Sequence, residues 1–113
     1  MHHELLTVDV LPDRERIILA PHGELDQFSA SLLRETISET IASGWDDVVL
    51  DLRKLTFMDS GGVHLLQDLR DGVFGDARFT MIDGTGPAAL PLHMLGGPRF
   101  LPLAEVGSEH ALV

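Results

Sequence analysis

Two neighbouring elements can be recognised in DDVVLDLRKLTFMDSGGVHLLQDLRDGVF, which runs from Asp46 to Phe74. The apolar run Val48–Leu50 lies between acidic residues and is typical of a short strand buried on both faces of a sheet. A turn containing Phe57 and Met58 is predicted next. Beyond it, apolar residues recur at helical spacing. These are Val63, Leu65, Leu66, Leu69 and Val73. The stretch therefore predicts a central strand followed by a helix with one apolar face.

Ser60 lies where the loop after this strand meets the predicted helix, within Asp59-Ser60-Gly61-Gly62. A hydroxyl at this place can cap free backbone N–H groups, a role worth about 1 kcal/mol. A phosphate on the same oxygen would instead meet the positive end of the helix dipole. Position alone favours the capping role.

The N-terminal part of the chain predicts a hairpin. Leu6, Val8 and Val10 alternate with polar residues, as in a half-exposed strand. Turn residues occupy Pro12–Glu15, and the apolar run Ile17–Ala20 is close enough to pair with the first strand.

A helix is predicted after Gly23-Glu24-Leu25-Asp26, because Leu33, Ile37 and Ile41 are spaced by four. Gly44 is a suitable stop for this helix.

The C-terminal third predicts one further strand, Phe79–Ile82, and weaker elements after it. A third helix starting at Thr85–Pro87 should be short or irregular, because Pro91 inside a helix costs about 3 kcal/mol. Phe100–Leu103 suits a last edge strand, and Ser108–Leu112 suits one helical turn. A hairpin followed by alternating helices and strands predicts an α/β fold, with helices packed on a mixed sheet.

Length and charge restrict the class of protein. A chain of 113 residues with 44% hydrophobic content predicts one domain over residues 1–113, with Met1–His3 either disordered or derived from a tag. There is no cysteine, no apolar run of membrane-spanning length and no signal-peptide pattern, so we expect a cytoplasmic protein. The net charge of −10 excludes nucleic acid and membranes as partners and favours a protein with a basic patch.

Two blocks resemble the STAS domain family, and within it the bacterial anti-sigma factor antagonists. The first is Gly23-Glu24-Leu25-Asp26, and the second is Leu52-x-x-Leu55-x-Phe57-Met58-Asp59-Ser60-x-Gly62. The second block is the specific one. Nearly the whole chain can be laid along such a domain in the same order of elements.

The resemblance implies a regulator that is not an enzyme and has no cofactor or metal. When its serine is free it binds an anti-sigma factor, itself a serine kinase with a Bergerat ATP-binding fold, and so frees the sigma factor. Phosphorylation by that kinase ends the interaction, and a metal-dependent serine phosphatase restores it. Ser60 matches the phosphoacceptor, and we expect a monomer or weak dimer. The predicted partner-binding residues are Asp26, Met58, Asp59, Ser60, Gly61 and His64.

Several alternatives stay open beside this resemblance. Asp26 fits the cap of the first helix equally well, and Asp59 fits a loop acid that repels a nearby phosphate. Met58 suits packing better than contact, and His64 suits the surface better than a catalytic base. Gly61 departs from the serine or threonine usual in the family, and it loosens the helix start by about 1 kcal/mol relative to alanine.

Other functions have weaker support from the residues. A hydrolase nucleophile elbow needs glycine two residues before the serine, where this chain has Met58. A phosphoaspartate receiver centred on Asp51 lacks its late lysine, because Lys54 is the only lysine. No metal-ligand spacing relates the histidines His22, His64, His93 and His110. The remaining alternative is a STAS module that binds a small ligand, or is a subunit of a larger regulatory or transport complex, with Ser60 never phosphorylated.

Overall fold

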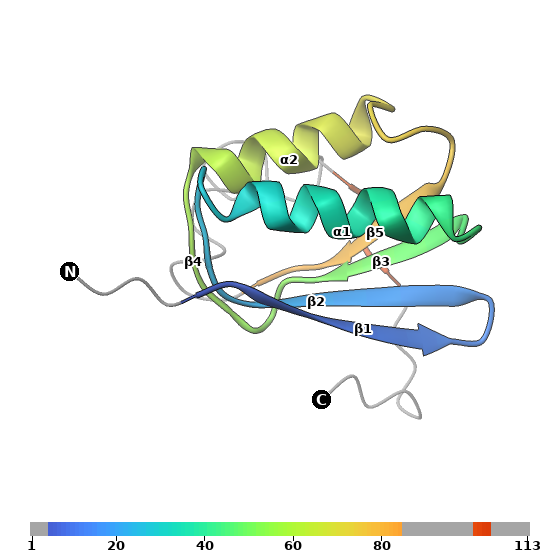
Figure 1. Cartoon of the computed structure of the whole chain (residues 1–113), viewed down its shortest axis with the longest axis horizontal. Coiled ribbons are helices and arrows are strands. Elements are labelled where there is room, and N and C mark those ends of the chain that lie inside the picture. Colours follow the sequence, from blue (N-terminus) through green and yellow to red (C-terminus); the bar gives the residue numbers. More distant parts are fainter. Residues whose placement is uncertain (1–4, 85–100, 105–113) are drawn as a thin grey trace.

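The computed structural model describes residues 5–84 and 101–104, which form a five-stranded mixed sheet with two helices on one face (Figure 1). The strands are β1 (Thr7–Asp13), β2 (Arg16–Leu25), β3 (Asp47–Asp51), β4 (Leu55–Met58) and β5 (Arg78–Ile82); the helices are α1 (Ala30–Ala42) and α2 (Ser60–Arg70). The predicted α/β class, with its N-terminal hairpin and mixed sheet, is confirmed.

Strand β2 organises the sheet because it pairs with three other strands. β1 runs antiparallel along it, β3 is parallel to its first half, and β4 is parallel to its last residues. The pairing register shifts between Gly23 and Glu24, and Gly23 has a φ of 101°, which glycine adopts without strain. β2 is therefore longer than the predicted run Ile17–Ala20 and includes Gly23–Leu25.

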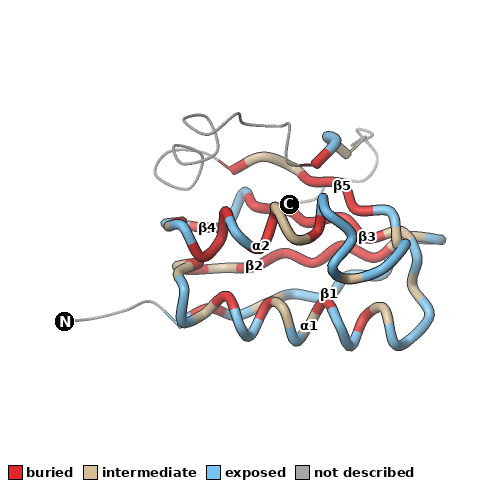
Figure 2. Tube along the Cα trace, turned by 90° about the horizontal axis from the view of Figure 1, so that it is seen from above, coloured by how far each residue is buried: buried red, intermediate tan, exposed pale blue. Residues whose placement is uncertain are grey.

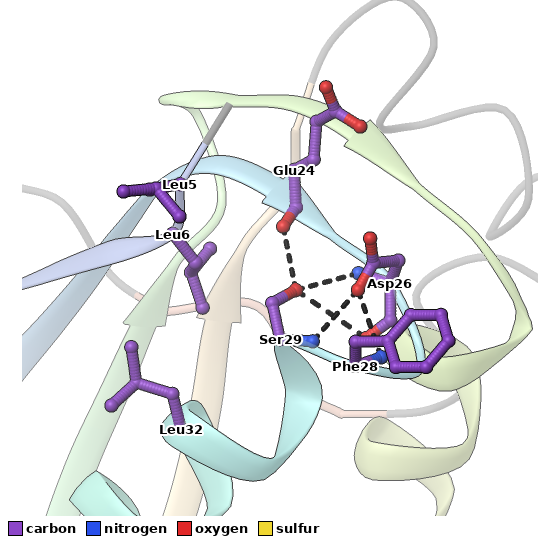
Figure 3. A pocket seen from close by; sticks show the side chains of 7 residues that line it. All are labelled: Leu5, Leu6, Glu24, Asp26, Phe28, Ser29 and Leu32. Atoms are coloured by element: carbon purple, nitrogen blue, oxygen red, sulfur yellow. Dashed lines mark hydrogen bonds between the residues drawn. The ribbon is translucent and has the colours of Figure 1, made fainter. Parts of the chain in front are cut away.

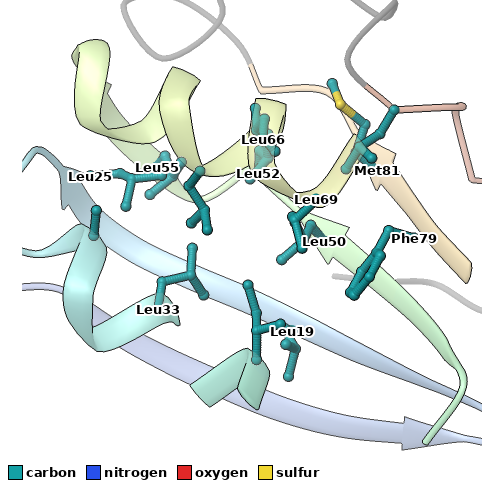
Figure 4. Close-up of a cluster of buried hydrophobic side chains, with 14 of the residues drawn as sticks. Leu19, Leu25, Leu33, Leu50, Leu52, Leu55, Leu66, Leu69, Phe79 and Met81 are labelled. Atoms are coloured by element: carbon teal, nitrogen blue, oxygen red, sulfur yellow. The ribbon is translucent and has the colours of Figure 1, made fainter. Parts of the chain in front are cut away.

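The hydrophobic core lies between the two helices and the sheet (Figure 4). Leu33 and Ile37 of α1 are fully buried, as is Leu65 of α2, because their spacing places them on the helix faces that meet the sheet. Figure 2 shows the same division, since buried residues recur along one side of each helix while exposed residues occupy the other. The core fixes both helices, and with them the position of α2's first turn.

Three local predictions are wrong. Pro12 and Asp13, predicted as turn residues, are the last residues of β1, where they pair with Ile17 and Arg16. Phe57 and Met58 do not form a turn but belong to β4, because they pair with Glu24 and Leu25 of β2. Helix α2 ends at Arg70 and not beyond Val73, which is 63% exposed and so does not belong to its buried face.

The C-terminal predictions are tested only in part. Leu103 forms an isolated parallel bridge with Met81 on the outer edge of β5, as expected of an edge segment. Phe100, the third helix predicted after Thr85 and the turn at Ser108–Leu112 lie outside the described residues.

Candidate functional site

The starts of the two helices lie next to each other because β2 and β4 are parallel neighbours. Both strands end at the same edge of the sheet, and each is followed within a few residues by a helix. The Asp59 N–H donates a hydrogen bond of 3.1 Å to the Leu25 carbonyl, which ties the entry of α2 to the end of β2. Ser60 is thereby held beside the β2–α1 loop, which begins at Asp26.

Asp59 is the N-cap of α2. Its backbone is extended, and its carboxylate accepts a 2.7 Å hydrogen bond from the Gly61 N–H. Ser60 is the first residue of α2, so the capping role considered for Ser60 belongs to Asp59. Asp59 is therefore a helix cap and not simply an acidic residue of the loop. The Ser60 side chain is exposed, and within residues 5–84 and 101–104 its hydroxyl has no hydrogen-bond partner. This oxygen is free to react or to contact a partner.

Gly61 allows the start of α2 to touch the backbone of the β2–α1 loop. A Cβ at Gly61 would lie 2.5 Å from the Gln27 Cα and 2.6 Å from the Gln27 nitrogen, closer than real Cβ contacts permit. At Gly62 the nearest atoms belong to side chains, the Met58 Cγ at 2.6 Å and a Leu25 methyl at 2.9 Å. The presence of Gly61 where the family usually has serine or threonine thus has a structural cause, since only glycine permits this close contact.

A hydrogen-bond network shapes the loop opposite Ser60 (Figure 3). The Asp26 carboxylate accepts hydrogen bonds from the N–H groups of Phe28 and Ser29, at 2.9 and 2.8 Å. The Ser29 hydroxyl donates to the Glu24 carbonyl at 2.7 Å and accepts from the Asp26 N–H at 2.9 Å. Asp26 therefore organises the turn before α1, and it remains half-exposed.

The structure separates the six predicted partner-binding residues into two groups. Ser60 and His64 are exposed, and Asp26 and Asp59 are half-buried, so all four can be reached from solvent. The other two, Met58 and Gly61, are buried; Met58 is only 2% exposed and packs in the core, so its side chain is not a surface contact.

Sequence reasoning missed the loop residues beside Asp26. Phe28 is 80% exposed although it is aromatic. In the sequence, the one indication that Phe28 is exposed was its place within the otherwise polar segment Asp26–Ser29.

Beside this loop is an open cavity of about 510 Å³ with a mostly apolar lining (Figure 3). Its walls include Leu5 and Leu6, which precede β1, together with Phe28, Leu32 of α1, and the acidic residues Glu24 and Asp26. This cavity is called the β2–α1 groove below.

Asp51 is not arranged as a phosphoacceptor. It is 3% exposed and forms two hydrogen bonds with the Arg53 guanidinium, at 3.0 and 2.9 Å. The bond to the Asp51 carboxylate raises the pKa of Arg53 above its usual value, as expected of a guanidinium beside a carboxylate.

The described part of the chain contains no group of three or more His, Cys, Asp or Glu side chains placed to hold a metal ion. It also contains no helix long and apolar enough to cross a membrane.

A comparison with known protein families shows to which family this chain belongs. The model of the STAS domain matches residues 8–88, which include every strand and helix described above except the first residue of β1. This chain belongs to the STAS domain family.

Relatives of this STAS domain include regulators of sigma factors. The anti-sigma-F factor antagonist RsfB of Mycobacterium tuberculosis is 26% identical over 91 residues, which are 80% of this chain and 75% of the relative. An anti-sigma factor antagonist from Mycobacterium paratuberculosis has the same fold, with a TM-score of 0.76 at 24% identity over 93% of this chain and 90% of that one.

The fold is also shared with the anti-sigma factor antagonist SpoIIAA. Its unphosphorylated form gives a TM-score of 0.67 at 22% identity, covering 94% of this chain and 93% of SpoIIAA. The phosphorylated form of SpoIIAA from Bacillus gives 0.61 at 24% identity, covering 94% and 96%.

Proposed function

We propose that this STAS domain is an anti-sigma factor antagonist switched by phosphorylation of Ser60. With Ser60 free, the domain binds an anti-sigma factor that is also a serine kinase, and the sigma factor is released. The observation that carries the proposal is the exposed Ser60 hydroxyl, without a partner in the described chain, at the first turn of α2. The relative RsfB, an anti-sigma-F factor antagonist, supports the general role.

Neighbouring hydroxyls are less suited to accept a phosphate. The Ser29 hydroxyl is half-buried and bonded to the Glu24 carbonyl, so its modification would break the loop before α1. The Ser31 hydroxyl is exposed but donates a 2.9 Å hydrogen bond to the Phe28 carbonyl. Ser60 can be modified without the loss of any such bond.

A phosphate on Ser60 should leave the domain folded. It adds about −1.5 to −2 charges. The helix dipole favours this charge by about 0.3–1 kcal/mol, while the nearby Asp59 carboxylate opposes a charge of this size by about 1.5–2 kcal/mol at high dielectric before screening by salt. Because these effects oppose each other and differ by only about 1 kcal/mol, the free energy of unfolding should change little. That SpoIIAA has this fold in both its forms is consistent with such a switch.

The same phosphate would block a close interface. A partner surface packed over Ser60 would have to remove water from a dianion that it does not pair with. The half-buried acids Asp26 and Asp59 already make this surface acidic, which fits a partner with basic residues. The switch therefore acts by charge at the interface and needs no refolding.

The remaining parts of the proposal follow from this role. A metal-dependent serine phosphatase would remove the phosphate and restore binding. The domain itself catalyses no reaction, acts in the cytoplasm where sigma factors are available, and is a monomer or weak dimer. His64, one turn after Ser60 and exposed, is assigned to the contact surface.

Phosphorylation assays test the proposal directly. The protein is incubated with ATP and the anti-sigma factor kinase of its source organism, and then measured by intact-mass spectrometry and phosphopeptide mapping. We expect one phosphate, located on Ser60, and none on the Ser60→Ala variant. A phosphate on Ser29, Ser31 or Thr56 with Ser60 unmodified would sink the proposal, as would a wild-type protein that is never modified.

A further inference from the structure

Exposed apolar side chains gather at the β2–α1 groove. Leu5 is 84% exposed, Phe28 is 80% exposed and Leu32 is 43% exposed, and all three line this one cavity. Single exposed hydrophobic residues are ordinary on protein surfaces, but a contiguous group around a hollow is typical of an interaction site. Figure 3 shows Leu5, Leu6 and Leu32 on one side of Ser29 and Phe28 on the other.

The backbone holds Phe28 in its exposed position. Its N–H donates to the Asp26 carboxylate at 2.9 Å, and its carbonyl accepts the Ser31 hydroxyl at 2.9 Å. The aromatic ring is thus presented by a loop that is already ordered. Binding to such a surface loses less conformational entropy than binding to a mobile one.

The charge of the groove indicates what would occupy it. Glu24 and Asp26 line it, and the protein carries a net charge of −10. An apolar hollow with an acidic rim is complementary to an apolar side chain with cationic neighbours.

We propose that the β2–α1 groove anchors one large apolar side chain, flanked by Lys or Arg, from the anti-sigma factor. This inference rests on the proposed function, because the partner is the same protein that contacts Ser60. Asp26 belongs both to the groove and to the loop against which Gly61 packs, so one surface joins the groove to the phosphorylation site. The groove supplies affinity, and Ser60 supplies the switch.

Binding measurements with the anti-sigma factor of the source organism test the anchor. Phe28→Ser and Leu32→Gln replace exposed side chains, and their folding is checked by melting temperature. Each should raise the Kd by about thirtyfold or more, as the loss of a hot-spot residue does. The control is Val73→Ser, because Val73 is also an exposed hydrophobic residue, at 63%, but follows the far end of α2. Its Kd should stay within about twofold of wild type.

Peptide titrations test the chemistry of the groove without the partner. Two short peptides, one with leucine between two lysines and one with leucine between two glutamates, are added to the ¹⁵N-labelled protein. The lysine peptide should shift the amides of Leu5, Phe28 and Leu32, and the glutamate peptide should not. Equal shifts with both peptides, or none with either, would overturn the charge assignment.

The outcomes separate the two proposals. If Ser60→Asp weakens anti-sigma factor binding while Phe28→Ser and Leu32→Gln bind like wild type, the groove inference is overturned and the proposed function stands. If the wild-type protein binds no anti-sigma factor, the proposed function falls, and the peptide titration alone decides the nature of the groove. A small uncharged ligand seated there, with no response to the lysine peptide, would also overturn the inference.

Discussion

Replacing Gly61 with alanine tests the contact that positions Ser60. The new Cβ would lie 2.5 Å from the Gln27 Cα and 2.9 Å from the Asp26 carbonyl carbon, and both are backbone atoms that no rotamer change can move. Overpacking of this kind costs about 1–3 kcal/mol. Because backbone atoms cannot yield as a side chain does, we expect the upper part of this range, about 2–3 kcal/mol. Alanine regains about 1 kcal/mol of helix propensity, so the expected net loss is about 1–2 kcal/mol.

Thermal and urea unfolding measure this loss. For a domain of this size, 1–2 kcal/mol corresponds to a fall in melting temperature of roughly 5–10 °C. Gly62→Ala is the matched control, because its Cβ meets only side-chain atoms of Met58 and Leu25. Methionine adapts easily to a changed neighbour, so Gly62→Ala should lose less stability than Gly61→Ala.

Backbone amide shifts give a second readout of the same change. In Gly61→Ala the largest shifts should appear at Gln27 and Phe28, since the loop has to move away from α2. A Gly61→Ala protein as stable as wild type, or more stable than Gly62→Ala, would refute the idea that this glycine is required by close contact.

Two further substitutions test the roles of Asp59 and Ser60 at the start of α2. Asp59→Ala removes the 2.7 Å cap on the Gly61 N–H and should cost about 1 kcal/mol in urea unfolding; an unchanged midpoint would show that the cap contributes nothing. Ser60→Ala removes no described hydrogen bond, so its free energy of unfolding should stay within about 0.5 kcal/mol of wild type, and a protein unfolded at room temperature would show a structural role for Ser60 instead.

The order of elements could be predicted from sequence because the apolar periodicity is strong. Val48–Leu50 forms the central part of β3, and Leu33 and Ile37 form the buried face of α1, as their spacing indicated. The limits of β2 and the existence of β4 could not be predicted in this way. His22 and Gly23 resemble loop residues, and they continue the strand only because partners from other parts of the chain pair with them.

The residue types at the site could be predicted from the sequence, but the role of each residue could be predicted less well. Asp59 and Ser60 are both suitable caps, and only the extended backbone of Asp59 and its bond to Gly61 assign the role. The need for glycine at Gly61 depends on Gln27, which lies far away in sequence, so no local pattern shows it. The exposure of Phe28 depends in the same way on the turn that Asp26 stabilises.

The affinity of the phosphorylated protein for the anti-sigma factor tests the central proposal most directly. Stoichiometrically phosphorylated and unmodified protein are titrated with the same anti-sigma factor, and amide shifts of both forms are recorded without it. Burying an unpaired charge costs at least about 2 kcal/mol, so the Kd should rise by about thirtyfold or more. Shifts should be confined to Asp26, residues 59–66 and their contacts. An unchanged Kd, or shifts spread through β2 and α1 with a large change in stability, would contradict a switch that acts at the interface.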